Sequence, residues 1–288
     1  MQSSSISIAY EGLIKYYDSL VDAGKPVCPI AHTYISCNVG VLINKDGEFL
    51  CAQVPSVKGE LVPVPCTIES DGRTRNISPH LLHDQLCYVT YYSDKYKEKY
   101  SAYINQLKSY VDSCPEDMYA NAVYKYVSKN TLMSDIKDIL DTIQLKFPKE
   151  NMNIIFCVYG MDNEGIDLKW TDWYLSKLKI NGLCHATGEK DYIPESYPKC
   201  TTSNNGKEVL FTKYSHIGYI ASQKIIHTIQ YLSYGRENHE RVETEYKFIE
   251  FLKGDTSEKD LKDWIDNNYP SKWDRAKELL LEKQKESS

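Results

Sequence analysis

The sequence lacks the local signatures of the common catalytic and nucleotide-binding sites. It contains no GxSxG, HExxH, P-loop or GxGxxG motif, so no serine-hydrolase, zinc-protease or phosphate-binding loop is indicated. It also contains no CxxC, and its nine cysteines are odd in number and scattered. This distribution argues against a zinc module and a disulfide framework, and it favours reduced, mostly buried thiols in a cytoplasmic protein. The sequence therefore predicts a protein without enzymatic activity and without a cofactor.

Arginine, net positive charge and long apolar runs are also scarce. Only five Arg occur among 288 residues, and the formal net charge is −6. A chain with this balance has no overall electrostatic attraction to nucleic acid, so any such binding requires a local basic surface. No segment approaches the roughly 20 apolar residues of a membrane-spanning helix, and the Ser-rich first seven residues do not resemble a signal peptide. We expect no contact with a membrane.

The residue patterns that are present predict an α+β protein, with small mixed sheets or hairpins packed against helices and a helical C-terminal segment. Asp46-Gly47 lies between two apolar runs in residues 35–54, which is a strong hairpin signal. Two prolines in residues 61–68 indicate an edge strand. Apolar periodicity predicts helices at residues 8–22, 94–112, 134–145, 171–178 and 217–232, and further strands at 153–159 and 208–212.

The chain changes character after residue 232, where charged helical sequence begins. We therefore expect two regions, residues 1–232 and residues 233–288. The second region carries Trp264 and Trp273. Two interpretations of these tryptophans stay open. They pack onto the preceding region and cap it, or they are exposed to a partner protein, since Trp is enriched at interface centres.

Several short motifs follow one another in a distinctive order. A Tyr-rich helix, AYEGLIKYYDSL, precedes the hairpin VGVLINKDGEFL. The segment RTRNISPHLLHDQLCYV follows and contains Arg73, Thr74, Pro79, Asp84, Tyr88 and Val89. The string CHATGE then places Cys184, Thr187, Gly188 and Glu189 ahead of Pro198 and SNNGKEVLFT.

In this order the motifs resemble the N-terminal half of the large subunit of type I-C CRISPR surveillance complexes, the Csd family. The resemblance spans about residues 9–232. It implies a subunit that joins other protein subunits and a guide RNA, inspects the short DNA motif beside the target, and helps to open the duplex. The chain departs from the family pattern at Asn76, His80 and Gln85, where the family usually has Gly, Asn and Asn. These departures fall on positions that the resemblance places near DNA.

The first candidate nucleic-acid site is the loop DGRTRN with its continuation. Arg73 and Arg75 are two of only five arginines, so their proximity is a local concentration of positive charge. A guanidinium group fits phosphates and guanine edges in a bidentate manner. Asn76 and His80 add groups that could reach a base edge. The alternative interpretation is a solvated turn with two surface charges.

The second candidate site is the stretch from Lys199 to Lys213. Lys199, Lys207 and Lys213 alternate there with small hydroxyl and amide side chains, which suits contact with a phosphate backbone. A flexible polar surface loop explains the same composition. This stretch and the first loop supply all the nucleic-acid contacts that the sequence predicts.

Two clusters could instead indicate chemistry. His80, His83 and Asp84 lie close together, but only Asp71 and Cys87 are near enough in sequence to complete a metal site that needs three or four ligands. Cys184 adjoins His185, yet adjacent residues rarely give the geometry of a nucleophile and its base. We expect neither a metal site nor a catalytic pair.

Three functional hypotheses remain open from the sequence. The chain is a compact large subunit that docks on the surveillance complex and contacts target DNA. Alternatively, it is a truncated mimic, encoded by a phage or mobile element, that displaces the native subunit and inhibits CRISPR immunity. The third hypothesis is an unrelated protein-interaction domain. The acidic charge and the substituted DNA-facing positions favour the mimic, whereas Arg73 and Arg75 favour the working subunit.

Overall fold

The computed structural model describes residues 5–25, 27–54, 61–73, 76–161, 166–197, 200–203, 206–208, 210–211 and 214–233. The chain divides into two compact units. Unit 1 consists of Met1–Val27 and Lys179–Ser288, and unit 2 consists of Cys28–Leu178. The predicted boundary at residue 232 stays a prediction, because residues 234–288, including Trp264 and Trp273, lie outside the described residues. In the described part of the chain, no helix is both long and apolar enough to cross a bilayer.

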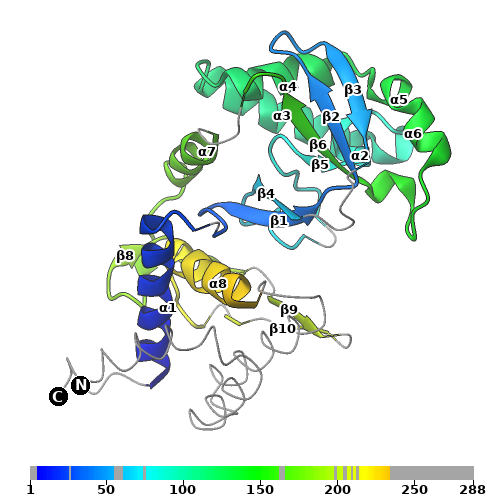
Figure 1. Ribbon diagram of the computed structural model, residues 1–288. Coiled ribbons are helices and arrows are strands. Elements are labelled where there is room, and N and C mark those ends of the chain that lie inside the picture. The colour runs from blue at the N-terminus through cyan, green and yellow to red at the C-terminus, as the bar shows by residue number, and fades with distance from the viewer. Residues whose placement is uncertain are drawn as a thin grey trace. The chain divides into compact units, whose positions relative to one another are not determined.

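A four-stranded mixed sheet forms the centre of unit 2 (Figure 1). Its order is β3-β2-β6-β5, from strands β2 (Val39–Ile43), β3 (Phe49–Gln53), β5 (Asp84–Gln85) and β6 (Asn153–Val158). β2 pairs in parallel with β6, whereas the β2–β3 and β5–β6 pairs are antiparallel. Burial alternates along β2, as expected for a strand: Val39, Val41 and Ile43 are fully buried, and the residues between them are not. The predicted hairpin and the predicted strand near residues 153–159 are confirmed.

A separate two-stranded ribbon in unit 2 pairs β1 (His32–Ser36) with β4 (Leu61–Pro65) in antiparallel register. Among the described residues, β4 has β1 as its one neighbouring strand, as expected for a strand with prolines, which lack an N–H. β4 leads directly into residues 66–83 and then β5, so the ribbon and the sheet bracket the first candidate loop.

Unit 2 also contains helices and 3-10 turns. In chain order they are α2 (Leu86–Val89), the 3-10 turn η1 (Asp94–Tyr96), α3 (Lys97–Ser113), α4 (Met118–Ser128), α5 (Leu132–Asp135), α6 (Lys137–Thr142), η2 (Lys149–Asn151) and α7 (Ile166–Leu175). α4 packs on β2 and β6, with the rings of Tyr126 and Phe156 at 5.8 Å between centroids. The hairpin turn is held to α4 because Lys129 Nζ donates to the Gly47 carbonyl at 2.8 Å.

Unit 1 is formed by the N-terminal and the C-terminal parts of the described chain. It contains α1 (Ser5–Asp22), α8 (Tyr219–Ser233), and two short antiparallel pairs, β7 (Gly182–Leu183) with β8 (Lys190–Asp191) and β9 (Cys200–Ser203) with β10 (Gly206–Glu208). Figure 1 shows α1 and α8 side by side, and Thr228 Oγ1 donates to the Leu13 carbonyl at 3.0 Å between them. These elements confirm the α+β class and the predicted helices at both positions.

Three predicted elements are displaced in the structure. The helix predicted at 134–145 is two short helices, α5 and α6, which break at buried Ile136. The first of them begins at Leu132, and the Thr131 hydroxyl before it donates to Asp135. The helix predicted at 171–178 is α7, which ends at Leu175. The strand predicted at 208–212 ends at Glu208, because Phe211 leaves the ladder and packs into the unit 1 core, 5.5 Å from the ring of Tyr10.

Candidate nucleic-acid interface

The first candidate site is the 71–78 loop, which runs from a tight turn after β4 toward β5. The turn is closed by Thr67 and Ser70, since the Ser70 Oγ accepts from the Thr67 amide at 2.8 Å and the Asp71 amide donates to the Thr67 carbonyl at 2.9 Å. Gly72 follows with φ of +64°, a conformation that Gly adopts without a steric penalty. The chain therefore enters the loop from a fixed direction.

The Arg73 side chain turns inward from the loop rather than toward solvent. Only 11% of it is exposed. Nη1 donates to the Ser78 carbonyl at 2.7 Å, and Nη2 is bonded to the Asp84 carboxylate. The guanidinium carbon lies 4.3 Å from the centre of the Tyr88 ring, which is a cation–π distance. Arg73 thus bonds the far end of its own loop and the first residue of β5.

Asp84 is the anion of this buried pair, and its residue is 1% exposed. Its Oδ2 accepts from the His80 amide at 2.8 Å, and its Oδ1 accepts from its neighbour's amide, that of Gln85, at 2.6 Å. Burial raises the pKa of Asp84 above its ordinary value, while the Arg73 charge and these hydrogen bonds oppose the rise. We call Arg73, Asp84 and Tyr88 the brace.

His80 lies beneath the loop and is 6% exposed. Its Nδ1 is within 3.1 Å of the Ser70 Oγ, so its ring links the turn before the loop to the segment after it. Burial, and secondly the Arg73 charge, lower the pKa of His80 well below its ordinary value, which keeps the ring neutral at physiological pH. The prediction that Arg73 and His80 contact nucleic acid stays a prediction.

The outer side of the loop carries different residues. Asn76 is exposed, and Ile77 is 44% exposed. Arg75, the second arginine of the predicted site, lies outside the described residues. An amide and an aliphatic side chain are groups that can address a base edge and an apolar base surface, respectively. The structure brings Arg73 and His80 together at Asp84, which both of them bond, and leaves Asn76 exposed.

The second candidate stretch belongs to unit 1. The backbone of Lys207 forms part of β10, where it pairs with Thr201 of β9. Lys199 and Lys213 lie outside the described residues, as do Trp264 and Trp273 of the predicted partner-binding set. A role of these four residues and of Lys207 in binding stays a prediction.

The metal and nucleophile candidates are engaged in other contacts. His83 Nδ1 accepts from the Phe156 amide at 3.1 Å, which ties the residue to β6, and Asp84 is the partner of Arg73. Buried Cys184 accepts at Sγ from the Gly218 amide at 3.1 Å, so its sulfur faces a backbone N–H. Among the residues that the structure describes, no group of three or more His, Cys, Asp or Glu side chains is arranged to hold a metal.

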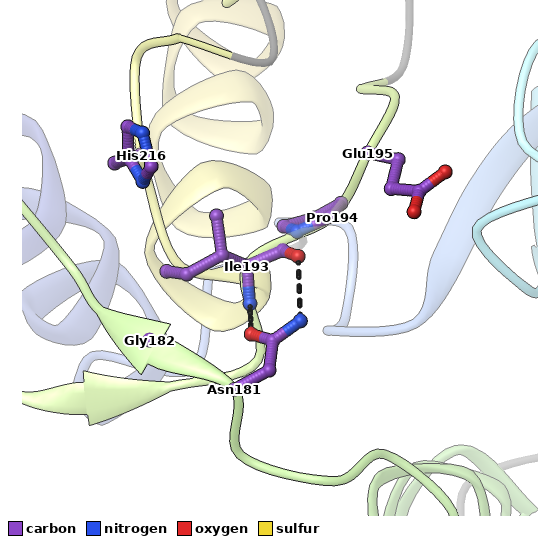
Figure 2. Close-up of a pocket in the computed structure, with 6 residues that line it drawn as sticks. All are labelled: Asn181, Gly182, Ile193, Pro194, Glu195 and His216. Atoms are coloured by element: carbon purple, nitrogen blue, oxygen red, sulfur yellow. Dashed lines mark hydrogen bonds between the residues drawn. The ribbon is translucent and has the colours of Figure 1, made fainter.

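A pocket in unit 1 is built from the β7 region and the approach to α8. Its volume is about 520 Å³, and it is lined by Asn181, Gly182, Ile193, Pro194, Glu195 and His216. The Asn181 side chain bonds both backbone groups of Ile193, at 2.7 Å to the amide and 3.2 Å to the carbonyl (Figure 2). Figure 2 shows Glu195 and His216 on opposite sides of Ile193, so the pocket holds no paired acid and base. None of the residues predicted from sequence lines it.

The sequence interpretation missed the brace itself. Asp84 was grouped with His80 and His83, and Tyr88 was only part of a motif. One signal was present: Asp84 lies within the apolar run PHLLHDQLCYV. A carboxylate inside such a run is expected to be buried, and a buried carboxylate requires a cation or several donors. Arg73 is the nearest preceding arginine described by the structure.

Comparison with known proteins identifies one family. The family profile described as CRISPR-associated protein (Cas_Csd1) matches residues 13–210. That range includes the second half of α1, the whole of unit 2 and the brace. No curated protein matches the chain.

Proposed function

The chain belongs to the Csd1 family of CRISPR-associated proteins, and from this premise we propose that it is a non-catalytic subunit of a type I-C surveillance complex. In this role it binds the other protein subunits, with their guide RNA, in the cytoplasm. It contacts target DNA beside the guide-matched site through the outer side of the 71–78 loop. The residues matched by the family profile include this loop. We assign no step of bond making or breaking to the chain.

The observation that carries this proposal is the construction of the loop. Its base is tied to the core of unit 2 by a buried ion pair, whereas Asn76 and Ile77 remain exposed. Recognition of a short DNA motif requires side chains held at a fixed distance and angle from the base edges. A loop with a rigid base and an exposed tip meets that requirement. A turn that is merely solvated would have no need of a buried ion pair at its base, so the ion pair favours recognition over the solvated turn.

Charge also bears on how the chain binds DNA. With a net charge of −6, the chain as a whole repels the phosphate backbone. Local contacts and the neighbouring subunits must therefore supply the attraction. Arg75, which adjoins the exposed Asn76 in sequence, is the cation that we assign to a phosphate contact.

The test measures equilibrium binding of a guide-matched duplex to the surveillance complex assembled with this chain, over a series of salt concentrations. We expect the complex to bind, with log affinity falling linearly with log salt concentration. Arg75→Ala should weaken binding and reduce the magnitude of the salt slope by about one. Lys137→Ala is the matched control, since Lys137 is an exposed cation on α6 of the same unit and should leave the slope unchanged.

The acidic balance favours a second candidate function, a mimic that occupies the large subunit's place and yields an inactive complex. The same preparation separates the two. A working subunit raises the affinity of the complex for target DNA, whereas a mimic displaces the native large subunit and abolishes that affinity. A chain that neither joins the complex nor competes with the native subunit contradicts both functions.

A further inference from the structure

We propose that Arg73 is a positioning residue, which closes the 71–78 loop from inside so that Asn76 and Ile77 meet DNA in one fixed arrangement. This inference rests on the proposed function and assigns separate roles in it to different residues of the loop. Arg73 and Asp84 shape the loop, while the exposed Asn76 and Ile77 contact the DNA.

The first argument is the path of the Arg73 side chain. Its backbone lies at the start of the loop, and its Nη1 reaches the Ser78 carbonyl at the end, so one side chain spans the loop. The same guanidinium is held by the Asp84 carboxylate on one side and lies over the Tyr88 ring at 4.3 Å. Three separate contacts leave the planar group one orientation.

The second argument is electrostatic. A phosphate contact strengthens binding by bringing an unneutralised cation to the backbone and releasing counterions. The charge of Arg73 is already compensated by Asp84, and the side chain is 11% exposed. To reach a phosphate, Arg73 would have to leave a carboxylate that is 1% exposed, which would strand that charge inside the protein. The pair is therefore unsuited to a direct contact.

The third argument is that the support beneath the brace is itself fixed. Tyr103 of α3 donates its hydroxyl to the Leu82 carbonyl at 2.7 Å, and His83 accepts the Phe156 amide of β6 at 3.1 Å. Leu82, between the loop and β5, has a φ of +64°, and these neighbouring bonds hold it in that uncommon conformation. The residues beside Asp84 are thus bonded to both the sheet and a helix, so the position of its carboxylate is fixed. Because Arg73 is bonded to this carboxylate, the position of the loop is fixed as well.

The experiment compares Arg73→Ala, Arg73→Lys and Arg75→Ala in the assembled complex, at a temperature where each variant is folded. Two quantities are measured for each: the salt slope, and the ratio of affinities for duplexes with the correct and a scrambled flanking motif. Arg73→Ala should lower the affinity ratio by about tenfold and leave the salt slope unchanged. Arg73→Lys should not restore the ratio, because an ammonium group is a single point donor without the fork that bonds Ser78 and Asp84 together.

A salt slope that falls by about one in Arg73→Ala would show a direct phosphate contact and overturn the inference. An unchanged affinity ratio would also overturn the inference. It would mean that Arg73 affects only the fraction of folded protein, and a change in that fraction does not alter the preference for one duplex over the other. Should Arg73→Ala fail to fold, Asp84→Asn provides the second variant. It removes the carboxylate charge with little change of shape, and it should lower the ratio in the same direction.

A wild-type complex that does not bind DNA would refute the proposed function, and a second readout then decides the inference alone. Hydrogen exchange of the loop amides in the full chain should be faster in Arg73→Ala than in the wild type, with the amides of β6 unaffected. Equal exchange in the loop would show that Arg73 does not hold it.

Discussion

Removing either partner of the Arg73–Asp84 pair should destabilise unit 2 strongly, and removing both should cost much less than the sum. Each single substitution to Ala leaves a charge in a site that is 11% exposed on the Arg73 side and 1% exposed on the Asp84 side. Breaking a buried pair in this way typically costs about 3–5 kcal/mol. In Arg73→Ala the cost includes the charged hydrogen bond to Ser78, about 1.5–3 kcal/mol.

The double variant Arg73→Ala/Asp84→Ala strands neither charge. Its destabilisation should therefore fall short of the sum of the single variants by at least about 2 kcal/mol. The backbone amides of His80 and Gln85, which donate to Asp84 in the wild type, lose an acceptor in the double variant, so some destabilisation remains.

The two single variants should also differ in pH dependence. Without the Arg73 charge, the pKa of Asp84 is raised further above its unfolded value, because burial then acts with less opposition. A proton held more tightly in the folded state stabilises at low pH, and that stabilisation is lost as pH rises through the folded pKa. Arg73→Ala should therefore be less destabilised at pH 5 than at pH 8. Asp84→Ala should show no such relief, because the guanidinium group stays protonated.

The assay is urea denaturation followed by tryptophan fluorescence. Replacing Trp264 and Trp273 by Phe leaves Trp170 and Trp173, both in unit 2, as the only reporters. Additive single variants, with a coupling energy below about 0.5 kcal/mol, would refute the view that the pair is one structural device. Equal costs of Arg73→Ala at the two pH values would refute the electrostatic account of it.

Two further predictions concern residues on either side of the brace. Because the pKa of His80 is lowered in the folded state, unfolding takes up a proton as pH falls through about 6.5, and the wild type should lose up to about 1 kcal/mol of stability between pH 6.5 and 5.5 through this residue. In His80→Gln that part of the loss should vanish in urea titrations at the two pH values, and an unchanged pH dependence would contradict it. Gly47→Ala should cost about 2–4 kcal/mol in thermal or urea unfolding, because φ is +74° and the new Cβ would lie 2.7 Å from the Lys125 Cβ. The matched Gly12→Ala in α1 meets nothing within 4 Å and should instead stabilise by up to about 1 kcal/mol, so a similar loss in both variants would refute the steric argument.

The fold was predictable from sequence where local chemistry decides it. Asp46-Gly47 specified the hairpin, the prolines of residues 61–68 specified a strand with one neighbour, and apolar periodicity located α1 and α8. The parallel pairing of β2 with β6 was not predictable, because it joins residues more than a hundred positions apart. The break at Ile136 was also missed, because the apolar pattern of residues 134–145 runs through that residue, whereas its φ of −104° and ψ of 17° lie outside the helical range.

The candidate site was predictable in location but not in orientation. A cluster of arginine, glycine and asparagine in residues 71–76 indicated a loop, and the described residues 71–73 and 76 lie outside helices and strands. The sequence does not reveal that Arg73 points inward, because this depends on Asp84 arriving beneath the loop through β5 and on Tyr88 following in α2. Asn76, which the sequence predicts to reach a base edge, is exposed, and its contact with nucleic acid stays a prediction.

The division of the chain into an interrupted unit 1 and a continuous unit 2 has a consequence for biosynthesis. α1 is made before unit 2, yet its partner α8 emerges about two hundred residues after α1, as the 215-residue separation of Leu13 and Thr228 shows. At a translation rate of about 5–20 residues per second, α1 waits for about 10–40 seconds. During that interval Tyr17 and Leu20, which are buried in the finished protein, have no α8 to cover them. All the strands of unit 2 are synthesised before α8 emerges, so we expect unit 2 to fold on the ribosome while unit 1 is still incomplete. Association of nascent α1 helices with one another is therefore an expected misfolding route.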